Sequence, residues 1–354
     1  MSGQVLRDDL VLEARRKELD YFNKKGVWRK RPKDESKKVT GKQPITVRWV
    51  DINKGDEVSP NYRSRLVARQ LKARDPSGDS FFAPTPPLEA LRTVLSLTAT
   101  TIGGHRPDWR PDSETRTQIS CMDVTRAYFN AKCDPSQPTY VTLPAEDPDA
   151  CDKIGLLLRH MYGTRRAADG WQEEYSTTLI DMGLVQGEAC ANLFRHEKYG
   201  IVCSVHGDDL TSSGPKDKLD WMEAEIQKYY EVTIQPRLGP GEGDAKEARV
   251  LNRIIRWCND RIEYKADPRQ TEKLIYDCGL EGSNSAATPG VRANFEAMEK
   301  DAELPARLHT AFRGAAARGN YLAADRLDCQ FSSKEISRHM AKPTQLAWES
   351  LRRM

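Results

Sequence analysis

Hydrophobic and polar residues recur along the first third of the chain in patterns typical of regular secondary structure. Apolar side chains at helical spacing predict helices over residues 8–22 and 88–102. Residues 45–52 and 63–70 are typical of two strands, which a turn joins into a basic hairpin. Residues 24–44 are polar and basic, and we interpret them as a loop.

Strand-like and helix-like segments alternate in the middle of the chain. Residues 117–129 predict a strand, and residues 200–214 predict two strands around a tight turn. Residues 217–230 have an apolar helical stripe, and residues 231–236 return as a strand. With one further helix before the hairpin, this order predicts an α+β fold whose small sheet carries helices on one face.

That further helix has an aromatic stripe. Its apolar positions recur at helical spacing and predict contacts with the core: Trp171, Tyr175, Leu179 and Met182. Asp169 is placed to cap the start of this helix, and Gly183 is placed to end it. We therefore interpret the stripe as core rather than as a ligand site.

Composition and charge narrow the classes of function. The chain has 354 residues, 38% of them hydrophobic, which is enough for two or three structural units. The segment from Lys24 to Asp75 has 16 Lys and Arg against six Asp and Glu, whereas the formal net charge of the chain is only +3. This local excess predicts either a solvated surface or one that binds phosphates.

The sequence lacks the signals of a membrane or secreted protein. No apolar run has the length of a membrane span, and residues 1–22 contain no signal-peptide core. The eight cysteines are scattered without the spacing of a zinc site. We therefore expect an intracellular protein, cytoplasmic or nuclear, with reduced thiols and no membrane partner.

Three aspartates are the candidate metal-binding residues. In "VHGDDL" (205–210), Asp208 and Asp209 follow a glycine, and these six residues alone indicate an ordinary hairpin turn. Asp123 changes this interpretation, because its neighbours in the predicted strand are apolar and period-two alternation puts it on one face with Ile119 and Cys121. Three carboxylates that converge from adjacent strands repel one another unless a cation lies between them. They suit two Mg²⁺ ions, roughly 3.5–4 Å apart, for an in-line phosphoryl displacement.

Five segments in order resemble the motifs of one polymerase family. They are "VRWVDINKGDEVSPNYRSRLVARQ", "MDVTRAYFNA", "HMYGTRRAADGWQEEY", "SVHGDDL" and "GNYLAADRLDCQFSSKEISRHMAKPTQLAWESLRRM". Together they resemble the reverse transcriptase domain of copia-type long-terminal-repeat retrotransposons, from about residue 10 to the C-terminus. The chain contains no ribonuclease H carboxylate cluster and no protease or integrase sequence, so we expect a piece of a polyprotein or a reading frame left by an element.

The resemblance implies a right-hand polymerase of α+β class, with an antiparallel palm sheet backed by helices. Residues 1–39 would form an N-terminal helix and basic loop, and residues 40–245 the fingers and palm. The palm would consist mainly of 119–133 and 166–245, and residues 246–354 would form a primer-grip hairpin and a thumb-like region.

The activity that the resemblance implies is RNA-directed DNA polymerisation. A primer on an RNA or DNA template would be extended with deoxynucleoside triphosphates, using two Mg²⁺ ions or Mn²⁺ in their place. Asp123, Asp208 and Asp209 would be catalytic and, with the backbone carbonyl of Val124, would bind the metal. The sequence does not indicate an oligomeric state.

Further roles are implied for residues around these aspartates. The residues implied to contact the nucleotide are Arg63, Arg65, Tyr128, Tyr162, Gly163 and Arg165. Those implied to contact primer or template are His206, Gly207, Leu251, Asn252 and Arg253. Among them, Arg65 would meet the triphosphate, because guanidinium donors match phosphate oxygens. Tyr128 would lie beneath the incoming sugar.

Some positions depart from the family and leave alternatives open. His206 and Gly207 replace the usual Tyr and Val, and Ala168 and Asp169 replace the usual Pro and Arg. One alternative is a relic without catalysis that only binds nucleic acid. Another takes "GDD" as the motif of an RNA-directed RNA polymerase. Tyr128 argues against the RNA polymerase, because an aromatic wall beneath the sugar excludes a ribose 2′-hydroxyl. The alternative is that Tyr128 is simply a buried aromatic of its strand.

Overall fold

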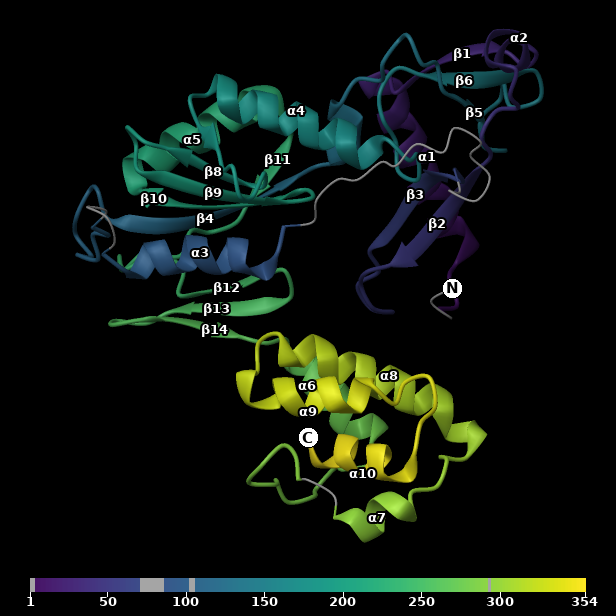
Figure 1. The fold of residues 1–354 in the computed structure, drawn as a ribbon. Helices are drawn as coiled ribbons and strands as arrows, with labels where there is room; N and C mark the ends of the chain where they lie inside the picture. The colour runs from purple at the N-terminus through teal and green to yellow at the C-terminus, as the bar shows by residue number, and fades with distance from the viewer. Residues whose placement is uncertain (1–3, 71–85, 102–105, 292–293) are drawn as a thin grey trace. The chain divides into compact units, whose positions relative to one another are not determined.

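A computed structural model gives the fold of this chain as two compact units, Met1–Glu242 and Gly243–Met354. The residues that it describes are 4–70, 86–101, 106–291 and 294–354. Figure 1 shows the helices and strands of both units. The last residue of the predicted helix 88–102 lies outside the described residues.

The centre of the larger unit is a six-stranded antiparallel sheet in the order β11-β4-β10-β9-β8-β7. Its strands are β4 (Thr117–Val124), β7 (Val185–Gln186), β8 (Leu193–His196), β9 (Ile201–His206), β10 (Asp209–Pro215) and β11 (Val232–Ile234). The predicted strands around the tight turn are confirmed as β9 and β10. The sequence pattern missed β7 and β8, because strands this short contain too few positions for alternation to be visible.

Helices cover both faces of this sheet. They are α3 (Leu88–Ala99), α4 (Ala167–Asp181) and α5 (Lys216–Tyr229). Ser120 of β4 faces α5 and donates from Oγ to Glu223 Oε1 at 2.6 Å. On the opposite face, Thr98 Oγ1 of α3 donates to Ser213 Oγ at 2.7 Å. The prediction of helices on one face holds for α4 and α5, whose apolar side chains share one core cluster with the sheet, but α3 also has an apolar stripe and covers the opposite face (Figure 1).

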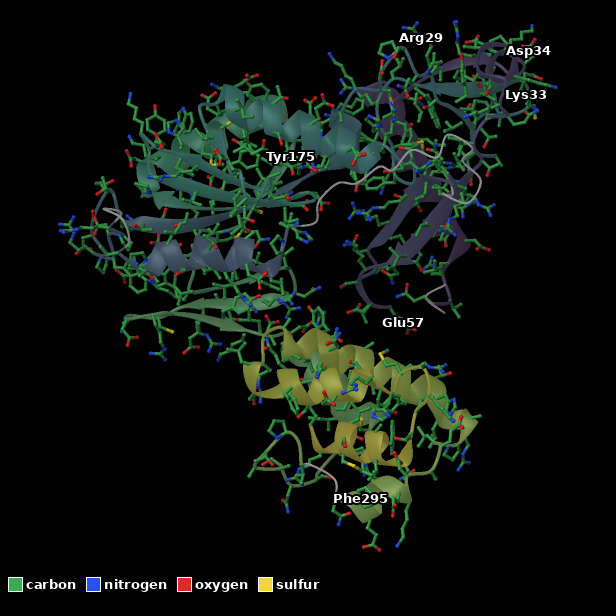
Figure 2. All side chains as sticks on the ribbon, viewed as in Figure 1. Arg29, Lys33, Asp34, Glu57, Tyr175 and Phe295 are labelled. Carbon is green, nitrogen blue, oxygen red and sulfur yellow. The ribbon has the colours of Figure 1, made fainter. Side chains whose placement is uncertain are left out.

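The aromatic stripe of α4 is confirmed as core. All four of its predicted members are buried against the sheet and α5: Trp171, Tyr175, Leu179 and Met182. Tyr175, labelled in Figure 2, lies 6.1 Å from Phe194 of β8 between ring centroids. Gly183 follows the helix with φ +90°, and its N–H donates to the Ile180 carbonyl, so the predicted end is also confirmed.

The rest of the larger unit is built from the N-terminal segment and residues 140–157. Its elements are α1 (Asp8–Lys25), β1 (Trp28–Pro32), α2 (Glu35–Thr40), β2 (Val47–Asn53), β3 (Tyr62–Ala68), β5 (Tyr140–Thr142) and β6 (Lys153–Leu157). The predicted hairpin is confirmed as β2 and β3. Residues 24–44 are not a loop, because β1 finds its hydrogen-bond partner in β6, where Trp28 lies opposite Leu157. Local sequence contains no sign of such a distant partner.

The smaller unit combines a three-stranded antiparallel sheet with a group of helices. Its elements are β12 (Glu247–Val250), β13 (Arg253–Trp257), β14 (Ile262–Lys265), α6 (Pro268–Asp277), α7 (Phe295–Glu299), α8 (Ala306–Ala323), η3 (Leu327–Cys329), α9 (Gln330–Ser337) and α10 (Gln345–Arg353). Phe312 of α8 is fully buried in the helical core with Leu351 of α10.

Two further features are the state of the cysteines and the hydropathy of the helices. All eight cysteines are free thiols. In the part of the chain that the structure describes, no helix has both the length and the apolar character needed to cross a membrane.

Candidate active site

The three predicted aspartates meet at one end of the central sheet. Asp123, next to last in β4, lies directly opposite Asp209, the first residue of β10. Side chains that face each other in this way have Cβ atoms about 4.5–5.5 Å apart and lie on the same face of the sheet. Asp208 precedes Asp209 in the turn from β9. The predicted convergence of these residues from adjacent strands is therefore a feature of the fold.

Contacts from neighbouring elements hold the β9–β10 turn in place. His206 and Asp209 are paired, so the turn has only two central residues, and Gly207 takes φ +65° at the first of them. This conformation favours glycine and matches the twist of the flanking strands. Trp171 Nε1 of α4 donates to the Gly207 carbonyl at 2.7 Å, and the Val124 N–H donates to the Asp208 carbonyl at 2.8 Å. The core aromatic Trp171 thus fixes the turn that carries the carboxylates.

The carboxylates lie in an environment that opposes their negative charge. Burial, and then the neighbouring Asp208 and Asp123, raise the pKa of Asp209 to about 6. Burial and Asp208 also raise the pKa of Asp123, whereas Arg63, Lys54 and Arg65 act in the opposite direction. Two like charges and reduced hydration explain both shifts. Such perturbed groups concentrate at functional sites.

Cations of the β2–β3 hairpin face these carboxylates. The pKa of Lys54 is lowered by partial loss of hydration and then by the charges of Arg63 and Arg65. The charges of Asp123 and Asp208 oppose this shift. Lys54 lies in the turn after β2, and the two arginines lie on β3. Among the residues that the structure describes, neither Arg63 nor Arg65 forms an ion pair with a carboxylate. The hairpin therefore presents cationic groups that can meet a polyanion.

Two tyrosines lie between the arginines and the aspartates. The Arg65 guanidinium carbon lies 4.9 Å from the ring centroid of Tyr162, and the Tyr162 ring lies 4.9 Å from the Tyr128 ring, edge to face. Burial, and then the Asp208 charge, raise the pKa of Tyr128, whereas Arg65 lowers it. Arg65, Tyr162 and Tyr128 thus form one continuous series of contacts beside Asp208. Tyr128 lies in the 3₁₀ helix η2 (Ala127–Asn130) and not in the strand, which ends at Val124.

Gly163 and Arg165 belong to a segment that docks on the end of β3. The Ala68 N–H donates to the Tyr162 carbonyl at 2.8 Å, and the Arg165 N–H donates to Gln70 Oε1 at 2.9 Å. Gly163 has φ +82°, and a Cβ atom there would collide with the Ala68 carbonyl oxygen. The observed reason for glycine at 163 is therefore the close approach of two backbones, which sets Tyr162 beside Arg65.

The predicted primer-binding residues of the smaller unit form a second hairpin turn. Leu251 and Asn252 connect β12 to β13, with φ +48° and +62°. Arg253 is buried, and its Nε donates to Asp325 Oδ2 at 3.1 Å. Its guanidinium also lies 4.8 Å from the Tyr321 ring centroid. Arg253 is thus bonded within its own unit, and the primer contact stays a prediction for Arg253 and for the two turn residues.

The donor set at the end of the central sheet suits a divalent cation in its chemistry. Carboxylate and backbone carbonyl oxygens are the ligands that Mg²⁺ prefers. Within the described ranges, however, no group of three or more His, Cys, Asp or Glu side chains is arranged to hold a metal ion. Asp123, Asp208 and Asp209 thus offer fitting ligand atoms without forming a closed ligand set, which agrees with their mutual repulsion.

One expectation about a nearby residue needs correction, and three nearby residues were not predicted. Asp169 does not cap α4, because the helix begins at Ala167 and Asp169 lies within its first turn. Its charge there still interacts favourably with the helix dipole. Lys54 was missed by the sequence analysis, although its place in the turn of a basic hairpin was a usable signal. Glu18 and Arg126 were also missed: Arg126 lies within "MDVTRAYFNA", but no local pattern pairs it with Glu18.

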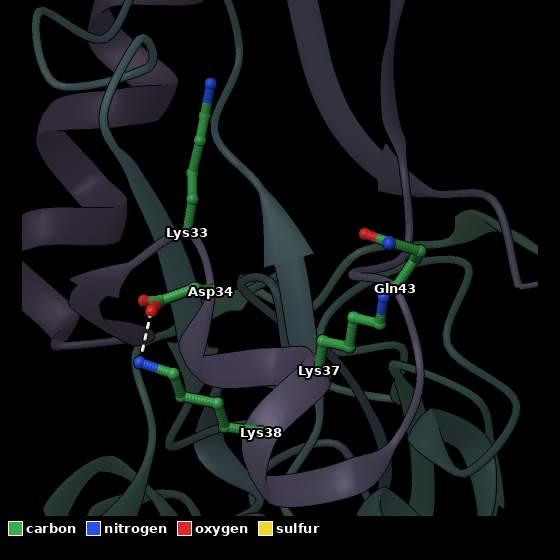
Figure 3. Close-up of a pocket in the computed structure, with 5 residues that line it drawn as sticks. All are labelled: Lys33, Asp34, Lys37, Lys38 and Gln43. Carbon is green, nitrogen blue, oxygen red and sulfur yellow. Dashed lines mark ion pairs between the residues drawn. The ribbon is translucent and has the colours of Figure 1, made fainter.

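A pocket lies apart from the aspartates, at α2. Its lining residues are Lys33, Asp34, Lys37, Lys38 and Gln43, around a volume of about 480 Å³ (Figure 3). Asp34 forms an ion pair with Lys38. Among the described residues, Lys33 and Lys37 have no such partner. The pocket is therefore cationic and suits phosphate oxygens rather than an apolar ligand.

Comparisons with known proteins agree on one family. Residues 34–234, more than half of the chain, match the family model described as "Reverse transcriptase (RNA-dependent DNA polymerase)". The chain is 23% identical over 321 residues to the "Retrovirus-related Pol polyprotein from transposon RE2" of Arabidopsis thaliana, covering 88% of the chain and 20% of the relative. It is 21% identical over 292 residues to the "Retrovirus-related Pol polyprotein from transposon TNT 1-94" of Nicotiana tabacum, covering 79% and 20%. The chain thus spans a fifth of the length of these relatives.

Proposed function

Because this chain belongs to the reverse transcriptase (RNA-dependent DNA polymerase) family, we propose that it extends a primer on an RNA or DNA template with deoxynucleoside triphosphates. The observation that carries the proposal is the pairing of Asp123 with Asp209, next to Asp208, at an accessible sheet end. Nothing in the packing of the unit requires three carboxylates there. Their retention despite repulsion supports a catalytic role.

The aspartates would hold the metal of the reaction. Asp123, Asp208 and Asp209, with the Val124 carbonyl, would bind two Mg²⁺ ions, which activate the primer hydroxyl and neutralise the leaving oxygen when bound. Trp171 and the Val124 N–H keep the turn at a fixed place relative to β4. The carboxylates are therefore preorganised by elements that do not themselves react.

The cationic hairpin would bind the triphosphate. Arg65, supported by the Tyr162 ring, presents a planar set of donors that matches phosphate oxygens, and Arg63 and Lys54 add charge next to it. Tyr128 would lie under the incoming sugar, where its ring excludes a 2′-hydroxyl. In this assignment the hairpin belongs to the fingers, the central sheet is the palm, and the smaller unit carries primer grip and thumb.

Primer and template would follow the basic surfaces of the chain. His206 and Gly207 would lie near the primer terminus, since they precede the paired aspartates in the same turn. Tyr162, Gly163 and Arg165 would lie near the templating base. The excess of Lys and Arg between residues 24 and 75 would neutralise phosphates of the nucleic-acid backbone.

Primer extension on RNA tests the proposal. The purified chain, with Mg²⁺ and deoxynucleotides, should extend a DNA primer annealed to an RNA template, and Asp208→Asn should serve as the inactive control. Circular dichroism of both proteins reports whether they are folded. A folded wild-type chain that binds the primed template but gives no product would contradict polymerase activity and support the relic.

Tyr128→Val separates the DNA polymerase from the RNA polymerase. A valine removes the wall beneath the sugar, so incorporation of ribonucleotides relative to deoxynucleotides should rise about tenfold or more. A core aromatic of this size would instead cost on the order of 3–5 kcal/mol of stability and reduce the use of both nucleotides alike. Thermal unfolding and single-nucleotide extension distinguish these outcomes. An unchanged ratio in a well-folded variant would sink the assignment of Tyr128.

A further inference from the structure

The N-terminal helix α1 contacts the predicted active site, although it precedes the residues that match the family model. Four of its side chains recur at helical spacing and meet the segment that follows β4: Glu18, Tyr21, Phe22 and Lys25. Two of these, Glu18 and Phe22, are buried. The helix thus contributes one continuous face to the segment that carries Tyr128.

Glu18 holds Arg126 in an unfavourable backbone conformation. Arg126 has φ +48°, a region that residues other than glycine adopt mainly where their surroundings impose it. Its Nε donates to Glu18 Oε2 at 2.8 Å, its Nη2 lies 2.8 Å from the same oxygen in an ion pair, and its guanidinium lies 3.9 Å from the Tyr21 ring centroid. The Glu18 residue is only 2% exposed. A buried carboxylate and an aromatic ring therefore fix the residue two positions before Tyr128.

The same helix fixes the 3₁₀ helix η2 itself. The Phe129 ring packs edge to face on Phe22 of α1, with 4.7 Å between centroids, while the preceding Tyr128 ring packs on Tyr162. At the end of η2, Lys25 Nζ donates to Asn130 Oδ1 at 3.3 Å. The Phe129 ring also lies edge to face on Tyr162, with 5.7 Å between centroids, so Phe129 joins α1 to the aromatic group around Tyr128. The orientation of Tyr128 depends on how α1 holds this turn.

Another pair of contacts joins α1 to the strand beside Asp123. The Tyr21 hydroxyl donates to Glu231 Oε2 at 3.2 Å, and the Glu231 carbonyl accepts from the Thr125 N–H at 2.8 Å. Burial and the Glu231 charge raise the pKa of Tyr21 to about 12, so the hydroxyl keeps the proton that it donates. Thr125, which directly precedes Arg126, is thereby held from the β11 side.

The hairpin that presents Arg63 and Arg65 is also bonded to α1. Arg15 Nη2 of α1 donates to Asp51 Oδ2 at 2.6 Å, and Asp51 Oδ1 accepts from the Ser64 hydroxyl at 2.7 Å. Ser64 lies between the two arginines on β3 and is buried. One helix therefore touches both sides of the predicted nucleotide site, the phosphate side through Arg15 and the sugar side through Glu18.

We propose that α1 is a positioning element of the nucleotide site, in which Glu18 acts through Arg126 to set the orientation of Tyr128 beneath the incoming sugar. The inference rests on the proposed polymerase function and adds to it a helix outside the matched family region. Glu18 is a positioning residue, because its carboxylate bonds to Arg126 rather than to a reacting group. The helix thereby links nucleotide selection to the N-terminal segment.

Charge-neutral variants in the full chain test this inference. Glu18→Gln removes the ion pair at nearly constant size, Arg126→Gln removes it with a shorter side chain, and Glu13→Gln, in an exposed pair with Lys17 on the same helix, is the matched control. We expect Glu18→Gln and Arg126→Gln to raise the KM for deoxynucleotide about tenfold and to lower the discrimination against ribonucleotide, with kcat and primer–template Kd little changed. The double variant should be no worse than either single variant, since the two residues act as one unit.

Several results would overturn the inference. One is that folded Glu18→Gln and Arg126→Gln keep the KM and the nucleotide discrimination of the wild type. Another is that activity falls equally with both nucleotides, in proportion to the unfolded fraction of the protein. Loss of folding in both single variants would reduce α1 to a structural role. If the wild-type chain extends no primer, the proposed function fails, and a ¹⁹F resonance of 3-fluorotyrosine at position 128 decides the inference. That resonance must move in Glu18→Gln and stay in place in Glu13→Gln.

Discussion

Two hairpins of this chain have turns of two residues and hold charge in opposite ways. At β9–β10, Asp208 and Asp209 lie next to Asp123, and burial together with like charge raises the pKa of the two paired aspartates. At β12–β13, Arg253 follows the turn and pairs with Asp325, and their side chains are 6% and 1% exposed. The first turn concentrates charge of one sign, whereas the second buries charges of both signs.

The difference separates charge that serves the fold from charge that is available to a ligand. A buried ion pair is costly to break, because removal of one partner leaves the other uncompensated. Like charges at a sheet end instead reduce stability, and a protein retains them where they have a task. Substitutions at the two turns should therefore affect activity and stability in opposite proportions.

The largest effect is expected for activity at the β9–β10 turn. Asp123→Asn, Asp208→Asn and Asp209→Asn should each lower primer extension on the order of 10³-fold, because each removes charge from the metal-binding set. Their unfolding free energy should stay the same or rise, since repulsion is relieved. Primer extension and urea denaturation measure the two quantities. Near wild-type rates in any two of the variants would refute the catalytic assignment.

The opposite result is expected at the β12–β13 turn. Arg253→Met removes the buried ion pair between Arg253 and Asp325 and should lower the unfolding free energy of the smaller unit by about 3–5 kcal/mol. Arg253→Met combined with Asp325→Leu should recover most of this loss, as replacement of a whole buried pair often does. Primer affinity of the double variant is the informative control. A large loss of affinity in a stable double variant would show that Arg253 also contacts the primer.

The raised pKa of Asp209 predicts a pH dependence of stability. Its value of about 6 in the folded state exceeds the ordinary unfolded value of about 3.9, so the folded state binds the proton more tightly. The stability contribution of this carboxyl is thus fully present below about pH 4 and is lost as the pH rises through 6. Without divalent metal, urea midpoints of wild type should fall relative to Asp209→Asn between these values. A midpoint difference between the two proteins that stays constant across this range would contradict the charge repulsion. Added Mg²⁺ at pH 7 should reduce this midpoint difference.

The smallest effect is expected at the cationic pocket of α2, which contains both kinds of charge (Figure 3). Lys37→Gln removes a cation without an ion-pair partner in the described structure, whereas Lys38→Gln removes one that is paired with Asp34. If the pocket binds template phosphates, Lys37→Gln should reduce the slope of log binding constant against log salt by about 1, and Lys38→Gln by less. Fluorescence anisotropy with a labelled template measures both slopes. Equal slopes for both variants and wild type would exclude the pocket from the template path.

Sequence patterns predicted those elements whose partners lie close in the chain. The β2–β3 and β9–β10 hairpins, the aromatic stripe of α4 and the amphipathic helix α5 are confirmed, because local periodicity and turn residues determine them. Two features were not predicted: the strand β1, and the packing of α3 on the second face of the central sheet. β1 depends on β6, more than a hundred residues away, and the packing face of α3 depends on Ser213.

The candidate site was predictable through motifs rather than through contacts. The resemblance to copia-type reverse transcriptases is confirmed by the family match and the two Pol polyproteins. The convergence of Asp123 with Asp208 and Asp209 from adjacent strands was predicted, whereas the register that places Asp123 opposite Asp209 comes from the structure. The pairing of Glu18 with Arg126 could not be anticipated, because Glu18 lies outside the quoted motif segments and only tertiary packing brings it to Arg126, which lies within "MDVTRAYFNA".

The contacts of α1 also have a consequence for the order in which the site forms. Arg126 lies 108 residues after Glu18, and Glu231 lies 210 residues after Tyr21. Contacts between residues so far apart close late in folding, since large loops must be ordered first. During synthesis, Tyr21 cannot reach Glu231 until that residue has left the ribosome, at about 5–20 residues per second. The contacts of α1 with Arg126 and Glu231 are therefore completed about ten seconds or more after the helix has been synthesised, and only then is the candidate site complete.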